Sequence, residues 1–165
     1  MKTLLLVRHA KSSWKNPELS DRERPLNNRG KRDAPFMGKL LSERGVKPDL
    51  LITSPTNRAM TTARYVAHEL QYRISEIVTD ESLYGQTMDH ILHVIQGFEN
   101  SINTVMIIGH NPEITLCANY ITANTIENIP TCGIVCVDFS IELWNEIARG
   151  NGALRYFEYP KKYFK

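Results

Sequence analysis

Short apolar runs alternate along this chain with longer segments whose apolar residues recur at helical spacing. The apolar runs, rich in aliphatic and β-branched residues, predict strands at 3–7, 50–53, 74–78, 104–108, 133–139 and 154–159. The segments between them predict helices from Asn27 or Asn28 to Arg44, from Ser54 and Pro55 to Leu70, over 88–98 and over 114–121. The alternation favours a parallel sheet that helices cover on both faces.

The order of these elements predicts the fold class. Alternating strands and helices, followed by a final strand pair, predict a three-layer α/β/α sandwich whose mixed central sheet is mostly parallel, with about six strands and one antiparallel edge. Residues 11–25 are polar and without period, so they predict a loop over the end of the first strand. Pro35 should either kink the first helix or mark its start.

Composition narrows the class of protein. With 165 residues, 42% of them hydrophobic and 23% charged, the chain suits one domain spanning 1–165. A net charge of +2 without blocks of like charge argues against a nucleic-acid partner. No apolar stretch approaches the roughly 18 residues of a membrane span, so we expect a cytoplasmic monomer without a membrane partner. The odd number of cysteines predicts free thiols, and His90 and His93 lack a third ligand, so no metal site is predicted.

Four cationic or titratable side chains lie where the predicted strands end. Arg8 and His9 follow the first strand and His110 follows the fourth. Arg58 lies in the first turn of the helix after the second strand. Because the carboxyl ends of parallel strands meet at one edge of a sheet, these side chains should converge. Guanidinium groups and a helix N-terminus both bind phosphate oxygens, so the pattern predicts a pocket for a dianion.

The two histidines indicate a pocket that reacts with phosphate as well as binding it. A neutral imidazole can accept a phosphoryl group, whereas a protonated imidazole stabilises the charge of the transition state. His9 fits the first role and His110 the second. Each charge-assisted hydrogen bond contributes roughly 1.5–3 kcal/mol, so the cationic groups can supply the stabilisation without a metal or another cofactor. Lys11, Ser12 and Arg24 border the predicted pocket and are expected to contact substrate.

Four segments carry these residues: LVRHA at 6–10, RPLNNRG at 24–30, SPTNRAMTTA at 54–63 and IIGHNP at 107–112. In this order they resemble the motifs of the histidine phosphatase superfamily, and the chain most resembles its SixA-like phosphohistidine phosphatases. The resemblance implies a phosphoglycerate mutase-like fold and a transient phosphohistidine at His9. It also implies that Arg8, Arg58 and His110 complete the phosphate site. Ala10 departs from the glycine that is common in the family, and a turn with negative φ accommodates it.

The general acid is less clearly indicated. Relatives of the phosphoglycerate mutase type carry an acid in a segment of the form ERHYG, and Glu81 heads the similar segment ESLYG. Glu81 is therefore the predicted acid, with Asp80 as a weaker substitute. The alternative is that Glu81 is a solvated loop carboxylate, because a phosphoramidate nitrogen is protonated more easily than an ester oxygen.

Together these observations predict a metal-independent phosphatase that forms a phosphohistidine at His9 and then hydrolyses it. The resemblance implies a phosphohistidine on a histidine-containing phosphotransfer protein as substrate. The short chain leaves little room for insertions that would enclose a small sugar phosphate, which favours a phosphatase over a mutase. Two alternatives are a phosphatase for small phosphoesters, such as phosphosugars or nucleotides, and a phosphate-binding module without turnover.

Overall fold

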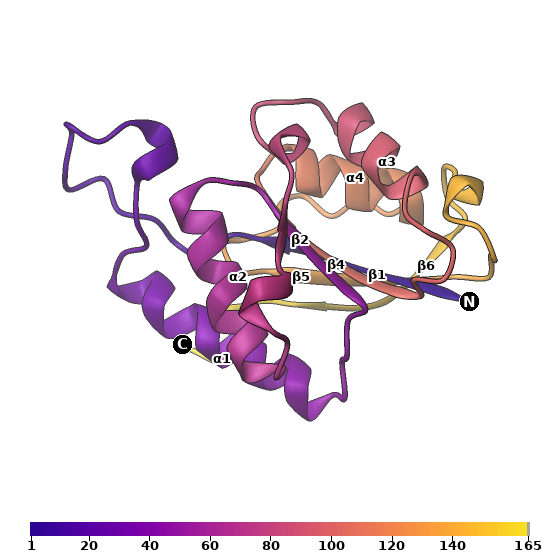
Figure 1. The fold of residues 1–165 in the computed structure, drawn as a ribbon, viewed down its shortest axis with the longest axis horizontal. Coiled ribbons are helices and arrows are strands. Elements are labelled where there is room, and N and C mark those ends of the chain that lie inside the picture. Colours follow the sequence, from indigo (N-terminus) through magenta and orange to yellow (C-terminus); the bar gives the residue numbers. More distant parts are fainter. Residues whose placement is uncertain (165) are drawn as a thin grey trace.

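Strand β1 crosses the middle of a mixed sheet in the computed structural model, which describes residues 1–164 (Figure 1). Within these residues the sheet has six strands: β1 (Lys2–Arg8), β2 (Leu50–Thr53), β3 (Val78–Thr79), β4 (Thr104–Gly109), β5 (Ile134–Phe139) and β6 (Gly152–Glu158). The α-helices of the same residues are α1 (Asn28–Glu43), α2 (Asn57–Glu69), α3 (Met88–Gln96) and α4 (Glu113–Thr122). No helix in this part of the chain has the length and apolar character that a membrane span requires.

The strands are arranged in the order β3-β2-β4-β1-β5-β6. Strands β1 to β4 pair in parallel, and β5 pairs in antiparallel fashion with both β1 and β6. The prediction of a mostly parallel, mixed sheet is confirmed, as is the pairing of the last two strands. The expected antiparallel edge is confirmed, because the edge strand β6 pairs in antiparallel fashion with β5, and a second antiparallel pair joins β5 to β1.

The apolar run of β1 supplies both faces of the sheet, because successive strand side chains point to opposite sides. Leu5 and Val7 pack in the cluster that α1 and α2 cover, whereas Leu4 and Leu6 pack in the cluster beneath α3 and α4. All four side chains are buried, and burying one such side chain fully contributes about 1.5–3 kcal/mol. Figure 1 shows the two helix pairs on opposite sides of the sheet, which confirms the predicted three-layer sandwich.

The prediction of a strand over 74–78 is wrong in its extent. A 3₁₀ helix spans Ile74–Glu76, and β3 is confined to Val78–Thr79, where it pairs with β2 at the edge of the sheet. The apolar residues that suggested a longer strand bury little surface, since Ile74 is 47% exposed and Val78 is 43% exposed. Strand formation depends on packing against neighbours, and this segment has little of it.

Helix α1 begins where the asparagines predict. The side chain of Asn27 accepts a hydrogen bond from the backbone N–H of Gly30 and caps the helix, whose first residue is Asn28. Pro35 lies inside the helix. The alternative that Pro35 marks the helix start is therefore wrong.

Helix α2 begins at Asn57, after the predicted opening at Ser54 and Pro55. The helix begins later than predicted because the side chain of Thr56 accepts a hydrogen bond from the backbone N–H of Ala59 and caps the helix there. The Ser54 hydroxyl consequently lies outside the helix, next to the ends of the strands.

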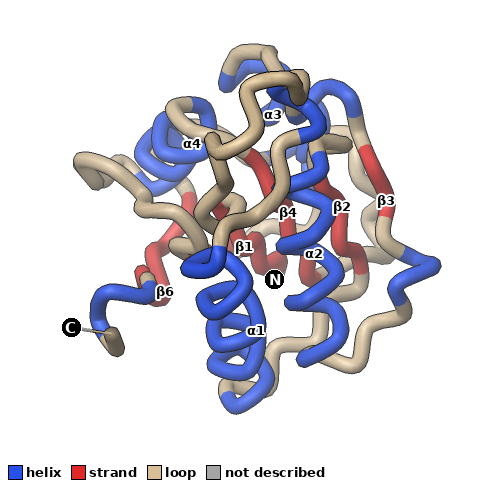
Figure 2. The backbone as a smooth tube through the Cα atoms, turned by 90° about the vertical axis from the view of Figure 1, so that its left-hand side faces the viewer, coloured by secondary structure: helices blue, strands red, loops and turns tan. Residues whose placement is uncertain are grey.

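The polar segment after β1 forms a loop, as predicted, and backbone hydrogen bonds join its two ends. The Ser13 N–H donates to the Pro25 carbonyl at 2.8 Å, and the Asn27 N–H donates to the Lys11 carbonyl at 3.0 Å. A Cβ atom at Gly30 would lie 2.2 Å from the Lys11 oxygen, so only glycine permits this close approach of α1 to the loop. Figure 2 views the molecule from this end, where loops cross in front of the strands.

Candidate active site

A cavity of about 360 Å³ opens at the carboxyl end of β1, between the loop over 11–25 and the first turns of α2 and α4. The residues that line it come from these segments and from the loops before α3 and β5: Arg8, His9, Lys11, Ser12, Trp14, Arg24, Arg58, Tyr84, Gly85, His110, Asn111, Glu113 and Thr131. Every predicted site residue except Glu81 therefore lies on the wall of one cavity.

His9 presents a neutral imidazole to this cavity. The Nδ1–H group donates a hydrogen bond of 2.7 Å to the carbonyl oxygen of Ala10, which assigns the proton to Nδ1 and leaves the lone pair on Nε2. Burial, followed by the charges of His110, Arg58 and Arg8, lowers the pKa of His9 to about 3, against the opposing effect of the Ala10 bond. An unprotonated Nε2 atom beside two guanidinium groups is suited to attack phosphorus.

His110 lies beside His9, with ring centroids 5.0 Å apart and ring planes inclined by 55°. The Ser54 hydroxyl lies 2.8 Å from Nε2 of His110 and fixes the orientation of the ring. Burial, and then the charge of Arg58, lowers the pKa of His110 to about 4. Without an anion the His110 ring is therefore neutral at pH 7. The expectation of a protonated ring concerns the site with phosphoryl oxygens bound, and it stays a prediction.

The guanidinium groups of Arg8 and Arg58 each keep an unused donor. Arg8 donates through Nη1 to the Ile129 carbonyl at 3.0 Å, and Arg58 donates through Nη1 and Nη2 to two oxygens of Asp21 at 2.6 and 2.9 Å. No acceptor within residues 1–164 contacts the buried Nε–H group of either arginine. A buried donor without a partner costs about 1–3 kcal/mol. Both guanidinium groups also carry positive charge on the cavity wall, which favours a bound anion.

Asp21 holds the cationic side of the cavity together. Its carboxylate accepts from Arg58, from Arg24 Nε at 3.1 Å and from the Tyr84 hydroxyl at 2.7 Å. The bond from Tyr84, followed by the bonds from the arginines, holds the pKa of Asp21 well below its usual range. Asp21 and Tyr84 were missed in the sequence because they lie in segments without periodicity. Clustered arginines require a carboxylate that compensates their charge, and this requirement is the signal from which Asp21 could have been predicted.

Trp14 stands at the rim of the cavity and was also missed. The guanidinium carbon of Arg24 lies 3.5 Å from the Trp14 ring centroid, and Arg24 Nη1 donates to the Ser12 hydroxyl at 2.8 Å. Arg24 is buried, whereas Trp14 is 73% exposed. The two predicted substrate contacts, Ser12 and Arg24, thus bond to each other and support an exposed aromatic ring, a cation–π arrangement that fixes its orientation.

The structure places Glu81 outside the cavity wall. Its side chain is 74% exposed and forms an ion pair with Arg22, and the Asp80 side chain accepts from the Ser82 N–H. The position of Glu81 matches the alternative of a solvated loop carboxylate. Among residues 1–164, Glu113 at the start of α4 is the one carboxylate that lines the cavity.

Two contacts fix the backbone next to His9. The Ala10 N–H donates to the Thr62 hydroxyl at 2.9 Å, and that hydroxyl donates to the Arg58 carbonyl at 2.8 Å. The Cys132 N–H donates to the His9 carbonyl at 3.0 Å. Ala10 has no positive φ, so alanine needs no left-handed backbone at the position where the family commonly has glycine.

No three His, Cys, Asp or Glu side chains in the described range of 1–164 converge so that they could hold a metal ion. The Nδ1 atom of His90 lies 3.1 Å from the Thr87 hydroxyl, on the same helix as His93. The cysteines are buried free thiols, as predicted: Cys117, Cys132 and Cys136. Arginine and lysine side chains supply positive charge on the cavity wall.

Similar proteins span most of this chain. An uncharacterised chloroplastic protein of Arabidopsis thaliana is 28% identical over 151 residues, which cover 87% of this chain and 69% of the relative. The structure of the protein histidine phosphatase SixA in complex with tungstate has a TM-score of 0.83 at 21% identity, covering 97% of this chain and 98% of that one. A mycobacterial glucosyl-3-phosphoglycerate phosphatase has a TM-score of 0.72 at 11% identity, with 97% and 100% covered. These two structures establish a shared fold.

The sequence match to a family is more direct. The family model of the histidine phosphatase superfamily (branch 1) matches residues 4–91, which is more than half of the chain. That range contains Arg8, His9 and Arg58, and the remaining half adds His110 to the same cavity. The family predicted from the motifs is confirmed, and the chain belongs to the histidine phosphatase superfamily.

Proposed function

We propose that this chain is a phosphatase that transfers a phosphoryl group to Nε2 of His9 and then hydrolyses the phosphohistidine. One observation carries the proposal: a neutral His9, with its proton held on Nδ1 by Ala10, shares a cavity with the guanidinium side chains of Arg8 and Arg58. Membership of the superfamily supports the same conclusion.

In the first step, Nε2 of His9 attacks phosphorus and forms a nitrogen–phosphorus bond. The bond from phosphorus to the leaving atom breaks, and the leaving atom takes up a proton from the solvent, which the water of the second step returns. Arg8 and Arg58 bind the phosphoryl oxygens in the ground state and in the transition state. A bound dianion raises the pKa of the neighbouring His110, so that the imidazole gains a proton and donates to a phosphoryl oxygen.

In the second step, a water molecule attacks the phosphorus of the phosphohistidine. The nitrogen–phosphorus bond breaks, inorganic phosphate leaves, and His9 returns to the neutral form with its proton on Nδ1. Over both steps one water is consumed, which provides the proton of the leaving group and the new oxygen of the phosphate. Because the arginines stabilise the phosphoryl charge, the proposed cycle requires no metal ion.

The substrate that fits this site best is phosphohistidine on a protein, such as a histidine-containing phosphotransfer protein. An imidazole leaving group is protonated readily, so its departure asks little of a general acid. The predicted acid Glu81 lies outside the cavity wall, which suits a substrate of this kind. The SixA structure that shares this fold is described as that of a protein histidine phosphatase.

A second candidate is a phosphatase for small phosphoesters, and Glu113 favours it. A carboxylate on the cavity wall can protonate an ester oxygen, which is a poorer leaving group than an imidazole nitrogen. The mycobacterial phosphatase with the same fold is described as acting on glucosyl-3-phosphoglycerate, a small phosphorylated molecule.

A side-by-side assay separates these candidates. The chain is offered a phosphohistidine peptide, a phosphoserine peptide, a sugar phosphate and a nucleotide, each with and without EDTA. We expect kcat/KM for the phosphohistidine peptide to be highest by about tenfold or more, a difference of roughly 1.4 kcal/mol, with no effect of EDTA. Higher kcat/KM for the sugar phosphate or nucleotide would establish the second candidate. Tight binding of a substrate without turnover of any of them would show that the chain is a phosphate-binding module.

A further inference from the structure

Two further cavities follow the catalytic cavity along one loop, the first adjoining the catalytic cavity and the second adjoining the first. Thr131 lines the catalytic cavity and also a cavity of about 210 Å³ that contains Arg29, Arg32 and Lys161. Pro130 lines this second cavity and also a third, of about 460 Å³. We name the second the basic cavity and the third the aromatic groove. Consecutive residues of one loop therefore connect the phosphoryl site to both.

This loop is held in place on the catalytic side. The Asn111 side chain and Arg8 both donate to the Ile129 carbonyl, at 2.9 and 3.0 Å. Farther along the loop, Asn119 exchanges two hydrogen bonds of 2.8 Å with the backbone of Ile126. A wall that is already ordered loses little conformational entropy when a partner binds to it.

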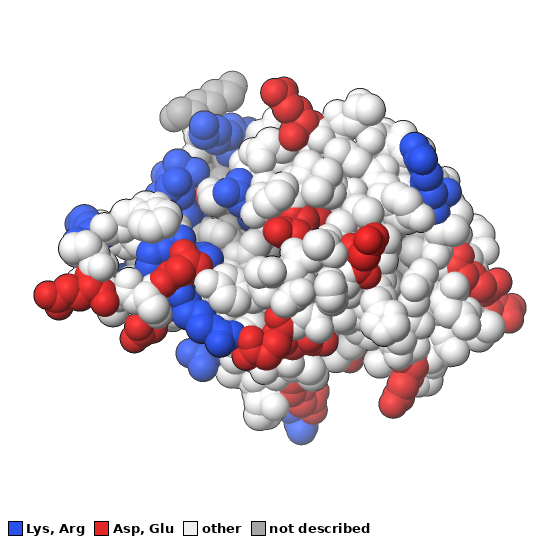
Figure 3. Space-filling view, turned by 90° about the horizontal axis from the view of Figure 1, so that it is seen from above, with Lys and Arg blue, Asp and Glu red and all other residues white. Residues whose placement is uncertain are grey.

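The basic cavity carries an excess of positive charge. Its lining includes Arg29, Arg32 and Lys161 against the single carboxylate of Asp33. Arg32 donates twice to that carboxylate, at 2.9 and 2.8 Å, and its guanidinium carbon lies 4.0 Å from the ring centroid of Phe164. Figure 3 shows Lys and Arg side chains gathered toward this end of the molecule. A cavity with three cations and one acid is complementary to acidic side chains.

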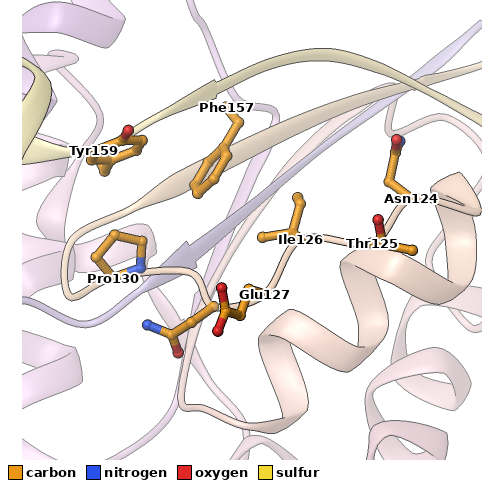
Figure 4. A pocket seen from close by; sticks show the side chains of 8 residues that line it. Asn124, Thr125, Ile126, Glu127, Pro130, Phe157 and Tyr159 are labelled. Carbon is orange, nitrogen blue, oxygen red and sulfur yellow. The ribbon is translucent and has the colours of Figure 1, made fainter.

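The aromatic groove has a different character. Figure 4 shows Phe157 and Tyr159 side by side, with Pro130 and Ile126 around the same opening. The ring centroids of Phe157 and Tyr159 are 5.1 Å apart. The partly buried residues Ile126, Pro130, Phe157 and Tyr159 form an apolar side of the groove that suits a large apolar side chain, and the exposed polar residues Asn124, Thr125, Glu127 and Asn128 form its other side.

We propose that the three cavities form one docking surface for a segment of a phosphorylated protein, an inference that rests on the function proposed above. The phosphorylated side chain enters the catalytic cavity, acidic side chains bind in the basic cavity, and an apolar side chain fills the aromatic groove. An extended chain advances about 3.3–3.6 Å per residue, so neighbouring side chains of one segment can occupy cavities that share a wall. A small phosphoester has no groups for the second and third cavities.

The test uses two synthetic peptides and free phosphohistidine. One peptide carries Asp, Glu and Leu on both sides of a phosphohistidine, and the other carries Asn, Gln and Ala at the same positions. For the wild-type chain we expect KM of the acidic peptide to be about fivefold to tenfold lower than that of the neutral peptide. Lys161→Glu should raise KM of the acidic peptide toward that of the neutral one, without changing KM of the neutral peptide or the kinetics of free phosphohistidine.

Lys39→Glu is the matched control, because Lys39 is an exposed lysine of α1 outside the three cavities. Tyr159→Ala should raise KM only for the peptide that contains leucine. Equal KM values for the two peptides with the wild-type chain, or equal effects of Lys39→Glu and Lys161→Glu, would overturn the docking surface.

Failure of the proposed function gives a different result. In that case neither peptide nor free phosphohistidine is hydrolysed, and binding of the dephosphorylated peptides is measured by fluorescence anisotropy. The docking surface then still requires tighter binding of the acidic peptide and its loss in Lys161→Glu. Equal binding of both peptides would overturn it independently of catalysis.

Discussion

The guanidinium group of Arg58 donates to both the carbonyl and the carboxylate oxygens of Asp21, at 2.6 and 2.9 Å. This pair connects the loop over 11–25 to the first turn of α2, next to the catalytic cavity. Tyr84 donates to the same carboxylate at 2.7 Å. A single acidic side chain therefore positions an arginine of the proposed phosphate site.

Asp21→Asn should lower kcat/KM by about 10- to 100-fold, which corresponds to roughly 1.4–2.8 kcal/mol of transition-state stabilisation. The amide lacks the charge that holds Arg58, so the guanidinium loses its fixed position. The inhibition constant of inorganic phosphate should rise in parallel, which a change in folding alone would not produce. Glu23→Gln is the control, because Glu23 lies in the same short helix and its side chain bonds only to Ser20 among residues 1–164. A similar loss in both variants would contradict the positioning role.

Stability should fall in mild acid because of the two active-site histidines. The pKa of His9 is lowered to about 3 and that of His110 to about 4, against about 6.5 in an unfolded chain. Between these values the unfolded chain binds more protons than the folded one, so the free energy of unfolding decreases as pH falls. The contribution is complete above about pH 6.5 and is lost progressively as pH falls, down to about 4 for His110 and about 3 for His9.

Urea denaturation at pH 7, 6 and 5 measures this effect. His110→Asn should show a smaller decrease in the free energy of unfolding between pH 7 and 5 than the wild-type chain, because one depressed pKa is removed. The exposed His68 provides the control in His68→Asn. A decrease in His110→Asn as steep as in the wild-type chain would show that the buried histidine does not carry the pH dependence.

Glu113→Gln should slow alkyl phosphoesters at least about tenfold more than phosphohistidine, because a poor leaving group depends more on a proton donor. Glu113 lines the cavity, whereas Glu81 is exposed and paired with Arg22. Glu81→Gln should therefore leave the ratio of the two rates unchanged. Steady-state rates with both substrates decide the matter, and a selective loss in Glu81→Gln would return the role of acid to Glu81.

Trp14→Ala should raise KM for phosphohistidine peptides about threefold to tenfold, with a smaller change in kcat, because an exposed aromatic ring at a cavity rim contributes contact area to a bound segment. Leu154→Ala removes another exposed apolar side chain, on β6 away from the cavity, and should leave KM unchanged. Equal KM values for the wild-type chain and Trp14→Ala would exclude Trp14 from substrate binding.

Most of the proposed catalytic set could be predicted because it depends on local sequence. Arg8 and His9 directly follow a continuous apolar run, and His110 follows another, so the ends of two buried strands place them. Arg58 lies in the first turn of α2, whose start the sequence also indicates. Parallel pairing of β1 with β4 then brings these positions together.

The remaining features depend on tertiary contacts that no local pattern reports. Asp21 and Trp14 lie in a polar loop without period, and bonds from Arg58 and Arg24 place them at the cavity. The neutral state of His110 results from burial and from the charge of Arg58, and both arise only in the folded chain. Glu81 has the motif position of a general acid, although its side chain is exposed to solvent and pairs with Arg22.

The central claim is that His9 accepts the phosphoryl group, and the most direct test is to trap the phosphorylated chain. Turnover is stopped in alkali within milliseconds, and the peptides are mapped by mass spectrometry. We predict an acid-labile, alkali-stable phosphate on the peptide that contains His9, and its absence from His9→Ala. Turnover by His9→Ala at the wild-type rate, or a wild-type chain that turns over without phosphate on His9, would contradict the account.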